Sequence, residues 1–222
     1  MSLRVRHFDF VPLVLYQDPL SPWCLVAEER IEAAAASLPG TFLPLRLEPF
    51  PTRVTPRALT KTERSVMARA ARRAAREPEL SGSIPDLWLS PDPPLSSFPV
   101  LTALYAARLQ GATRELALRS AIREAAHYRG LNVARLDVLL ELAQLSGLDV
   151  ARFAAALSSP ATGSRIAQSL QAALERGVRE VPALVIGDEW LVVGARRTEV
   201  YRSILRRYAS ARLGATAARV VH

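Results

Sequence analysis

The chain has 222 residues, of which 50% are hydrophobic, and it carries a formal net charge of +8. This length and apolar content suffice for a buried core without stabilising disulfides or structural metals. The single cysteine, Cys24, excludes an intramolecular disulfide and a multi-cysteine metal site. No uncharged apolar run approaches the roughly 18 residues that a membrane-spanning helix needs, so we expect no membrane segment.

The cysteine and the charge also bear on location and partners. A lone cysteine fits a reducing compartment, and the apolar run Phe10 to Tyr16 is short for a secretion signal and lacks a following cleavage site. We therefore expect a cytoplasmic protein. The one concentrated basic patch consists of Arg64, Arg69, Arg72, Arg73 and Arg76. Because it lacks the interleaved aromatic residues of a stacking surface, we expect no nucleic-acid partner.

The first predicted elements alternate strand and helix. The apolar run Val11 to Tyr16 predicts a buried strand, and Phe42 to Glu48 predicts a second. The helix between them is expected to begin at Ser21-Pro22, since serine is a good N-cap and proline suits the first helical position. It should end near Leu38-Pro39-Gly40. A helix of this length permits a right-handed crossover between parallel strands.

The middle of the chain is predicted to be helical. Thr60-Lys61-Thr62-Glu63 fits a capping box, and the helix that it opens should end before Pro78. The proline-rich segment from Pro78 to Pro99 predicts a loop. Further helices are expected at Pro99 to Gln110, Thr113 to Arg129, Ala134 to Ser146, Val150 to Leu157 and Ala161 to Arg176. Their C-terminal stops are glycines, namely Gly111, Gly130, Gly147 and Gly177.

The last predicted elements are two strands and a helix. Ala183 to Ile186 and Trp190 to Val193 predict strands joined by a turn at Gly187-Asp188, and Thr198 caps a helix to about Ala209. These parts match a thioredoxin-like sheet. We predict an α/β fold with residues 10–54 and 179–210 in a thioredoxin-like domain, 55–178 in an all-helical insertion and 211–222 in a loose tail.

The residues that carry chemistry follow the first strand. The sequence Asp18-Pro19-Leu20-Ser21-Pro22-Trp23-Cys24 leads into the start of the helix, where free N–H groups and the helix dipole stabilise a thiolate. In a Cys-x-x-Cys site the first cysteine attacks and the second resolves the mixed disulfide. Ser21 holds the first position here, so the chain by itself lacks the two-cysteine cycle.

This motif resembles that of the DsbA family, and within it the FrnE-type branch, whose usual motif is Asp-Pro-x-Cys-Pro-Trp-Cys. The resemblance runs from about Pro12 to Tyr208 and includes Glu48-Pro49-Phe50, Ala106 to Gly111, Leu139 to Ala143, Gly147 to Asp149 and Gly177 to Ile186. It implies a DsbA-like fold and a cis Val181-Pro182 peptide that faces the active site. Such a proline leaves a backbone edge open to an extended thiol-bearing peptide.

A serine at this position is also similar to that of 2-hydroxychromene-2-carboxylate isomerases and kappa-class glutathione transferases, where its hydroxyl bonds the thiol of glutathione. The kappa-type Gly-Ser-Asp-Arg is absent, because Gly194 leads into Ala195-Arg196-Arg197. The resemblance implies glutathione or another low-molecular-weight thiol as co-substrate, with no tightly bound cofactor.

Each candidate residue could also have a purely structural role. Ser21 could serve only as a helix cap. Cys24 shares a helical stripe with apolar residues that must pack on the sheet, so we interpret it as a weakly reactive structural cysteine rather than a working monothiol. Trp23 at the helix tip favours a binding role, although both it and Phe50 could be ordinary core.

Other residues give weaker signals. The three histidines are scattered without acidic partners at ligand spacing, so no metal site is expected. His127-Tyr128 could face the cleft, although helix packing is the safer interpretation. The proline-rich loop could act as a lid through Trp88 or Phe98, or it could only connect helices.

We therefore predict a thiol-binding cleft with Ser21 and Cys24 as catalytic positions, lined by Pro22, Trp23, Phe50, Val181 and Pro182. The predicted function is that of a DsbA-like protein of the thiol-disulfide oxidoreductase family, which acts on or with low-molecular-weight thiols or thiol-bearing peptides. Two alternatives stay open: a non-enzymatic thiol- or peptide-binding protein that has lost turnover, and a glutathione-dependent isomerase or transferase. A homodimer is a further possible assembly.

Overall fold

The computed structural model describes residues 9–38 and 41–218, and its centre is a mixed sheet with the strand order β4-β2-β5-β6. β2 pairs in parallel with β4 and antiparallel with β5, which pairs antiparallel with β6. The short strands β1 and β3 form a separate parallel pair. The strands are β1 (Asp9–Phe10), β2 (Leu13–Gln17), β3 (Thr41–Phe42), β4 (Leu45–Pro49), β5 (Ala183–Ile186) and β6 (Trp190–Val193).

The α-helices of the described residues are α1 (Pro22–Ala36), α2 (Lys61–Ala74), α3 (Phe98–Arg108), α4 (Ala112–Arg123), α5 (Leu136–Leu145), α6 (Val150–Leu157), α7 (Pro160–Glu175) and α8 (Thr198–Ala218). Two short 3₁₀ helices, η1 (Pro78–Leu80) and η2 (Pro85–Trp88), lie in the proline-rich segment. A π-helical turn, η3 (Glu124–Tyr128), continues α4. No helix in these ranges has the length and apolar character to cross a membrane.

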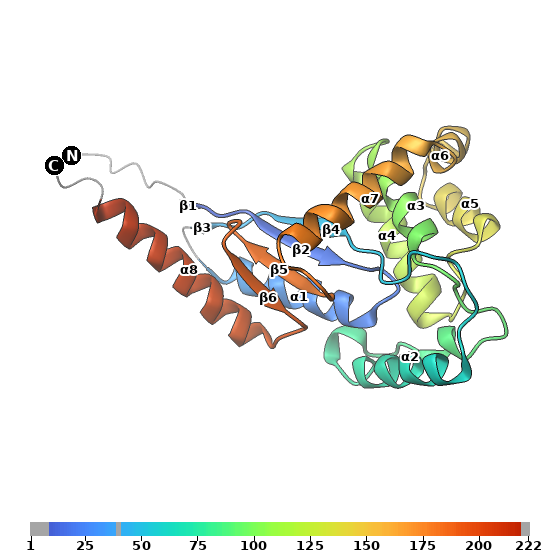
Figure 1. Ribbon diagram of the computed structural model, residues 1–222, viewed down its shortest axis with the longest axis horizontal. Coiled ribbons are helices and arrows are strands. Elements are labelled where there is room, and N and C mark those ends of the chain that lie inside the picture. The colour runs from blue at the N-terminus through green and yellow to red at the C-terminus, as the bar shows by residue number, and fades with distance from the viewer. Residues whose placement is uncertain (1–8, 39–40, 219–222) are drawn as a thin grey trace.

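Helices cover both faces of the sheet (Figure 1). Side chains of β2 alternate between the two faces, as a strand requires. Leu13 and Leu15 pack with α1 and α8, whereas Val14 and Tyr16 pack on the face that α7 covers. All five residues of β2 are buried, which is typical of a strand covered on both sides. The first turn of α1 is thereby held at the end of the central strand.

The helical segments between β4 and β5 build a second core. It gathers buried residues of α2, η2, α3, α4, η3, α5 and α6, with Val100, Leu118 and Phe153 among them. α7 contacts both α3 and β4, so it joins this core to the sheet. The predicted thioredoxin-like fold with a helical insertion is confirmed.

The observed elements differ from the predicted ones for local reasons. Leu43-Pro44 divides the predicted second strand into β3 and β4, since proline lacks the N–H that a sheet ladder needs. The helix predicted to reach Arg129 changes to a π-turn after Arg123. α8 continues to Ala218, past the predicted end at Ala209 and into the expected tail. Residues 219–222 of that tail lie outside the described residues.

Two sequence signals are reproduced directly. The Thr60 hydroxyl accepts the Glu63 backbone N–H, and the Glu63 carboxylate accepts the Thr60 N–H, which completes the predicted capping box. The turn between β5 and β6 places Gly187 and Asp188 at φ values of 57° and 64°. Such left-handed residues are typical of tight hairpin turns.

Gly187 should be the most sensitive glycine of this hairpin. A Cβ atom there would lie 1.9 Å from the Tyr208 hydroxyl oxygen, in addition to the cost of a positive φ. We expect Gly187→Ala to lower the free energy of unfolding by about 2–4 kcal/mol, the sum of left-handed strain and overpacking. Gly82→Ala is the control, because Gly82 has a φ of 82° with no atom within 4 Å. Equal losses for both variants in urea unfolding would contradict the predicted clash.

Candidate functional site

One carboxylate, that of Asp18, fixes the loop between β2 and α1. Asp18 is 0% exposed, and its Oδ1 atom accepts the Leu20 N–H at 3.0 Å. Its Oδ2 atom accepts the N–H of Thr52 at 2.9 Å and the Thr52 hydroxyl at 2.5 Å. Thr52 belongs to the loop after β4, so a single side chain joins the two loops at this end of the sheet.

Ser21 stands where the sequence places it, immediately before α1. Its backbone is extended (φ −92°, ψ 111°), and Pro22 occupies the first turn of the helix. The Ser21 side chain makes no capping hydrogen bond to the amides of that turn. The Ser21 side chain therefore does not act as a helix cap in this structure.

A cavity of about 220 Å³ opens beside Ser21. Its polar side chains are the hydroxyl residues Ser21 and Thr52, whereas α2 and η2 contribute apolar wall. The lining residues are Leu20, Ser21, Pro22, Trp23, Thr52, Met67, Ala70 and Trp88. Apolar walls with a few convergent polar groups are the usual composition of small-molecule sites.

The Cys24 thiol lies behind this cavity in the protein interior. Cys24 is 1% exposed, and its Sγ atom accepts the Asp18 N–H at 3.5 Å. Burial raises the pKa of Cys24 to about 12, although the Asp18 amide and the Ser21 side chain act to lower it. At neutral pH the sulfur is a protonated thiol, which agrees with the interpretation of Cys24 as weakly reactive.

The remaining predicted site residues divide into two groups. Trp23 is half-buried, lines the cavity and packs against the cluster that includes Ala74 and Leu80. Phe50 is buried in the core under α7, where it lies with the half-buried Val181. The Val181–Pro182 peptide is cis, as the family resemblance implied. Phe50, Val181 and Pro182 do not line the cavity beside Ser21.

His127 packs between helices rather than facing the cavity. It is 5% exposed, and its Nε2 atom lies 2.9 Å from the Pro19 carbonyl oxygen. Because a carbonyl only accepts, Nε2 carries the proton in this contact. Burial lowers the pKa of His127, so the ring is neutral at pH 7. The contact ties η3 to the loop that precedes Ser21.

The proline-rich segment supplies a fixed wall of the cavity. Trp88 is 3% exposed, and Arg64 donates to the carbonyl oxygens of Trp88 at 2.9 Å and of Ser90 at 2.5 Å. Sequence reasoning assigned Arg64 to a surface patch, yet its guanidinium holds this loop on α2. Met67 and Ala70 went unnoticed as wall residues, because no local pattern marks a helix residue that faces a distant loop.

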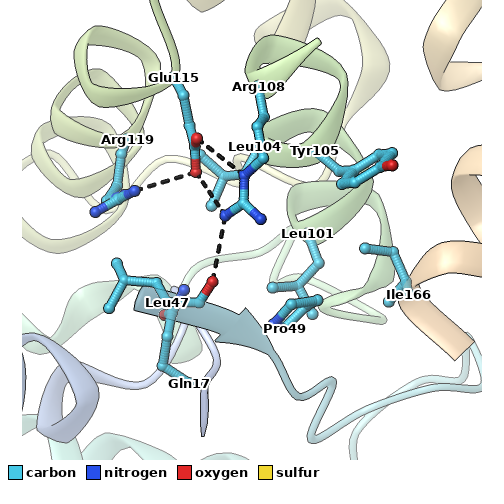
Figure 2. A pocket seen from close by; sticks show the side chains of 10 residues that line it. All are labelled: Gln17, Leu47, Pro49, Leu101, Leu104, Tyr105, Arg108, Glu115, Arg119 and Ile166. Atoms are coloured by element: carbon cyan, nitrogen blue, oxygen red, sulfur yellow. Dashed lines mark hydrogen bonds and ion pairs between the residues drawn. The ribbon is translucent and has the colours of Figure 1, made fainter. Parts of the chain in front are cut away.

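A second, smaller cavity separates β4 from the helical region (Figure 2). At its edge Arg108 pairs with Glu115 at 2.9 Å and donates to the Leu47 carbonyl oxygen at 3.2 Å. Arg119 bridges Glu115 at 3.1 Å and Glu28 of α1 at 3.0 Å. Burial raises the pKa of Glu28. With a volume of about 20 Å³ this cavity has room for a single water and no larger ligand.

Within residues 9–38 and 41–218, no group of three or more His, Cys, Asp or Glu side chains is arranged so that it could hold a metal ion.

Comparisons with known proteins agree with this architecture. A family model described as "DSBA-like thioredoxin domain" matches residues 12–206. Relatives in Bacillus subtilis and Halalkalibacterium halodurans are both named ClpXP adapter protein SpxH. The first is 29% identical over 208 residues, covering 87% of this chain and 67% of the relative. The second is 34% identical over 104 residues, covering 47% of this chain. The chain spans 67% and 34% of the lengths of these two relatives.

Solved structures show the same fold at low sequence identity. The cytosolic disulfide reductase DsbM from Pseudomonas aeruginosa superposes with a TM-score of 0.68 at 23% identity, covering 90% of this chain and 99% of DsbM. DsbM has also been solved with GSH. A 2-hydroxychromene-2-carboxylate isomerase gives a TM-score of 0.56 at 22% identity, covering 95% of this chain and 100% of the isomerase.

The buried thiol predicts a specific loss of stability at alkaline pH. Burial raises the pKa of the Cys24 thiol from 9.0 to about 12 in the folded state. The stability that the protonated thiol contributes is therefore fully present below pH 9 and is lost as pH rises toward 12. Over that window the free energy of unfolding should fall about 1.4 kcal/mol per pH unit more steeply in the native chain than in Cys24→Ala. Urea titrations at several pH values measure both slopes. Identical slopes, or fast labelling of native Cys24 by a thiol reagent, would contradict burial of the thiol.

Proposed function

The chain belongs to the DSBA-like thioredoxin family, and we propose that it binds a low-molecular-weight thiol at Ser21 and uses that thiol, rather than Cys24, as its reactive sulfur. The observation that carries this proposal is a contrast between neighbours. Ser21 lines a cavity with a hydroxyl that caps no amide, whereas Cys24 is 1% exposed with a pKa raised to about 12.

The hydrogen-bond inventory supports a donor role for the Ser21 hydroxyl. The Cys24 sulfur already accepts the Asp18 N–H and keeps its own proton. The Ser21 side chain lowers the Cys24 pKa, so its hydroxyl is a donor to the Cys24 sulfur. Because a hydroxyl turns about its Cβ–Oγ bond, the same O–H would donate to a thiol sulfur that enters the cavity. A thiolate bound there would also lie at the positive end of the α1 dipole, which favours the anion.

The bound thiol would serve either of two chemistries. As a thiolate it would attack one sulfur of a mixed disulfide, form a new S–S bond with it and release the other sulfur as a thiolate, which is the chemistry of a thiol-dependent reductase. Alternatively it would assist an isomerase or transferase reaction. The likeness to DsbM, solved with GSH, and to the isomerase supports glutathione or a related thiol as the first candidate. The likeness to DsbM, a cytosolic disulfide reductase, supports a cytoplasmic location.

Ser21→Ala tests this proposal. Loss of the hydroxyl should weaken binding of glutathione about 3- to 30-fold, the range expected for a hydrogen bond to a partly charged acceptor. Isothermal titration calorimetry measures the affinity. Ser120→Ala is the matched control, because Ser120 is exposed on α4 outside the cavity. Equal affinities for Ser21→Ala and the native chain would reject a thiol contact at Ser21.

A second candidate is a binding protein without turnover. It is favoured by the inaccessible Cys24 thiol together with the two relatives named as ClpXP adapters. In this proposal the fold presents the region around the cavity to a protein partner, and catalysis has been lost with the first cysteine.

Ser21→Cys separates the two candidates. If the site is intact apart from the missing sulfur, oxidised glutathione should convert the variant to a disulfide between positions 21 and 24, with two glutathione thiols released. The new thiol at the helix N-terminus should have a pKa of roughly 3.5–7.5 instead of ~8.5, and dithiol–disulfide exchange should appear. Mass spectrometry and an insulin-reduction assay measure both. A folded variant with neither property would favour the binding protein.

A further inference from the structure

A third cavity lies in the helical region, apart from the one beside Ser21. Its walls come from α3, α5, the end of α6 and the start of α7, which lie at the opposite end of the molecule from α8 (Figure 1). Its volume of about 420 Å³ lies within the range of roughly 300–1,000 Å³ that is usual for small-molecule pockets. It shares no described lining residue with the other two cavities. The thiol-binding function proposed above therefore makes no use of it.

The walls are mainly apolar and continue the helical core. Phe98 and Pro99 begin α3 and Leu157 ends α6, and all three are half-buried. Leu139 of α5 belongs to the core and is 1% exposed. Leu136, three residues earlier on the same face of α5, is 60% exposed. The apolar stripe of α5 thus runs from the core to the rim of the cavity.

The polar side chains of the wall are three hydroxyls. The Thr102 hydroxyl donates to the Phe98 carbonyl oxygen at 2.5 Å, so its proton is used within α3. Ser159 occupies the N-cap position of α7 with an extended backbone (φ −75°, ψ 126°), yet its side chain makes no capping hydrogen bond. Ser158 beside it is exposed. The turn between α6 and α7 therefore offers two hydroxyls to a cavity that is otherwise apolar.

Charge is balanced at the rim and absent from the wall. Arg135, directly before Leu136, pairs with Asp137 at 2.6 Å and with Asp92 at 3.3 Å. None of the described residues that line the cavity is charged. Because an ion among apolar side chains is costly without a partner, this composition favours an uncharged ligand.

Gly163 favours an open cavity over a stable helix. It is the fourth residue of α7, where glycine is the least favourable residue after proline. Its φ lies outside the left-handed region, and a Cβ atom there would lie 3.8 Å from two carbons of the Phe98 ring, which is ordinary van der Waals contact. Alanine would therefore fit, but any larger side chain would take space from the cavity. A residue that breaks a local rule without need is expected at functional sites.

The size of the cavity argues for a small molecule rather than a second protein. Ten residues line it, whereas a stable protein interface uses about 20–30 residues on each side. We propose that this cavity binds a small uncharged molecule, mainly apolar, with one hydrogen-bonding group at Ser158 and Ser159. Binding there does not depend on the proposed thiol function.

The test uses N-phenyl-1-naphthylamine, an uncharged aromatic amine whose fluorescence rises in apolar surroundings. The variant is Leu136→Ser, which removes apolar wall from an exposed position. Leu145→Ser is the matched control, because Leu145 is 74% exposed on the same helix and does not line the cavity. Gly163→Leu fills the cavity instead, with Ala161→Leu, also exposed on α7, as its control.

We expect saturable binding to the native chain and to both controls. The dissociation constant should be about 3- to 10-fold higher for Leu136→Ser, as expected for the loss of one partly exposed leucine contact. Gly163→Leu should weaken binding at least as much, and if it does not fold, the two α5 variants decide the test. Anilinonaphthalene sulfonate, which adds a sulfonate to the same rings, should bind more weakly at this site.

Several outcomes would overturn the proposal. One is a native chain that does not bind the amine, and another is equal affinity for Leu136→Ser and Leu145→Ser, which would place the amine elsewhere. Tighter binding of the sulfonate that is lost in Leu136→Ser would make the ligand an anion. If the amine does not bind but the native chain dimerises in light scattering and Leu136→Ser does not, this face is an interface between copies of the chain.

Discussion

The site depends on how the fold satisfies one buried polar side chain. A carboxyl group without hydrogen-bond partners is costly in a protein interior, and Asp18 is 0% exposed. Its side chain accepts three donors from Leu20 and Thr52. Its own main chain serves the site as well, because the Asp18 N–H reaches the Cys24 sulfur and its carbonyl oxygen accepts the Ser21 N–H at 2.9 Å. The position of Ser21 follows from this one residue.

The helical region reinforces the same loop from several sides. The His127 ring holds the Pro19 carbonyl, and Arg64 holds the η2 wall on α2. Arg108, Glu115 and Arg119 form a charged series at the β4 edge (Figure 2). Arg119 extends this series to Glu28 of α1, the helix that carries Cys24. Removing one member of such a series leaves an unpaired buried charge. The cavity beside Ser21 is thus a preformed surface rather than a gap between independent parts.

Local signals in the sequence account for most elements and for part of the site. Val150 to Leu157, Ala183 to Ile186 and Trp190 to Val193 have the predicted bounds, because caps, glycines and alternation act within a few residues. Pro22, Trp23 and Trp88 were named as candidates near the site, whereas the α2 wall was missed, since Met67 and Ala70 meet Ser21 only through tertiary packing. Asp18 had a readable signal: aspartate two residues before a turn amide commonly accepts it. Phe50 was placed among binding residues, yet its aromatic ring serves the core under α7.

The π-turn at η3 gives this region a length constraint. There the Arg129 N–H bonds the Glu124 carbonyl oxygen at 3.2 Å, five residues back, so the turn holds one residue more than an α-helix would. Each helical residue advances the side chains by roughly 100°. Deletion of one residue between Arg123 and Tyr128 would restore regular helix and rotate His127 away from Pro19. Related chains should therefore tolerate many side-chain exchanges along this segment but few changes in its number of residues.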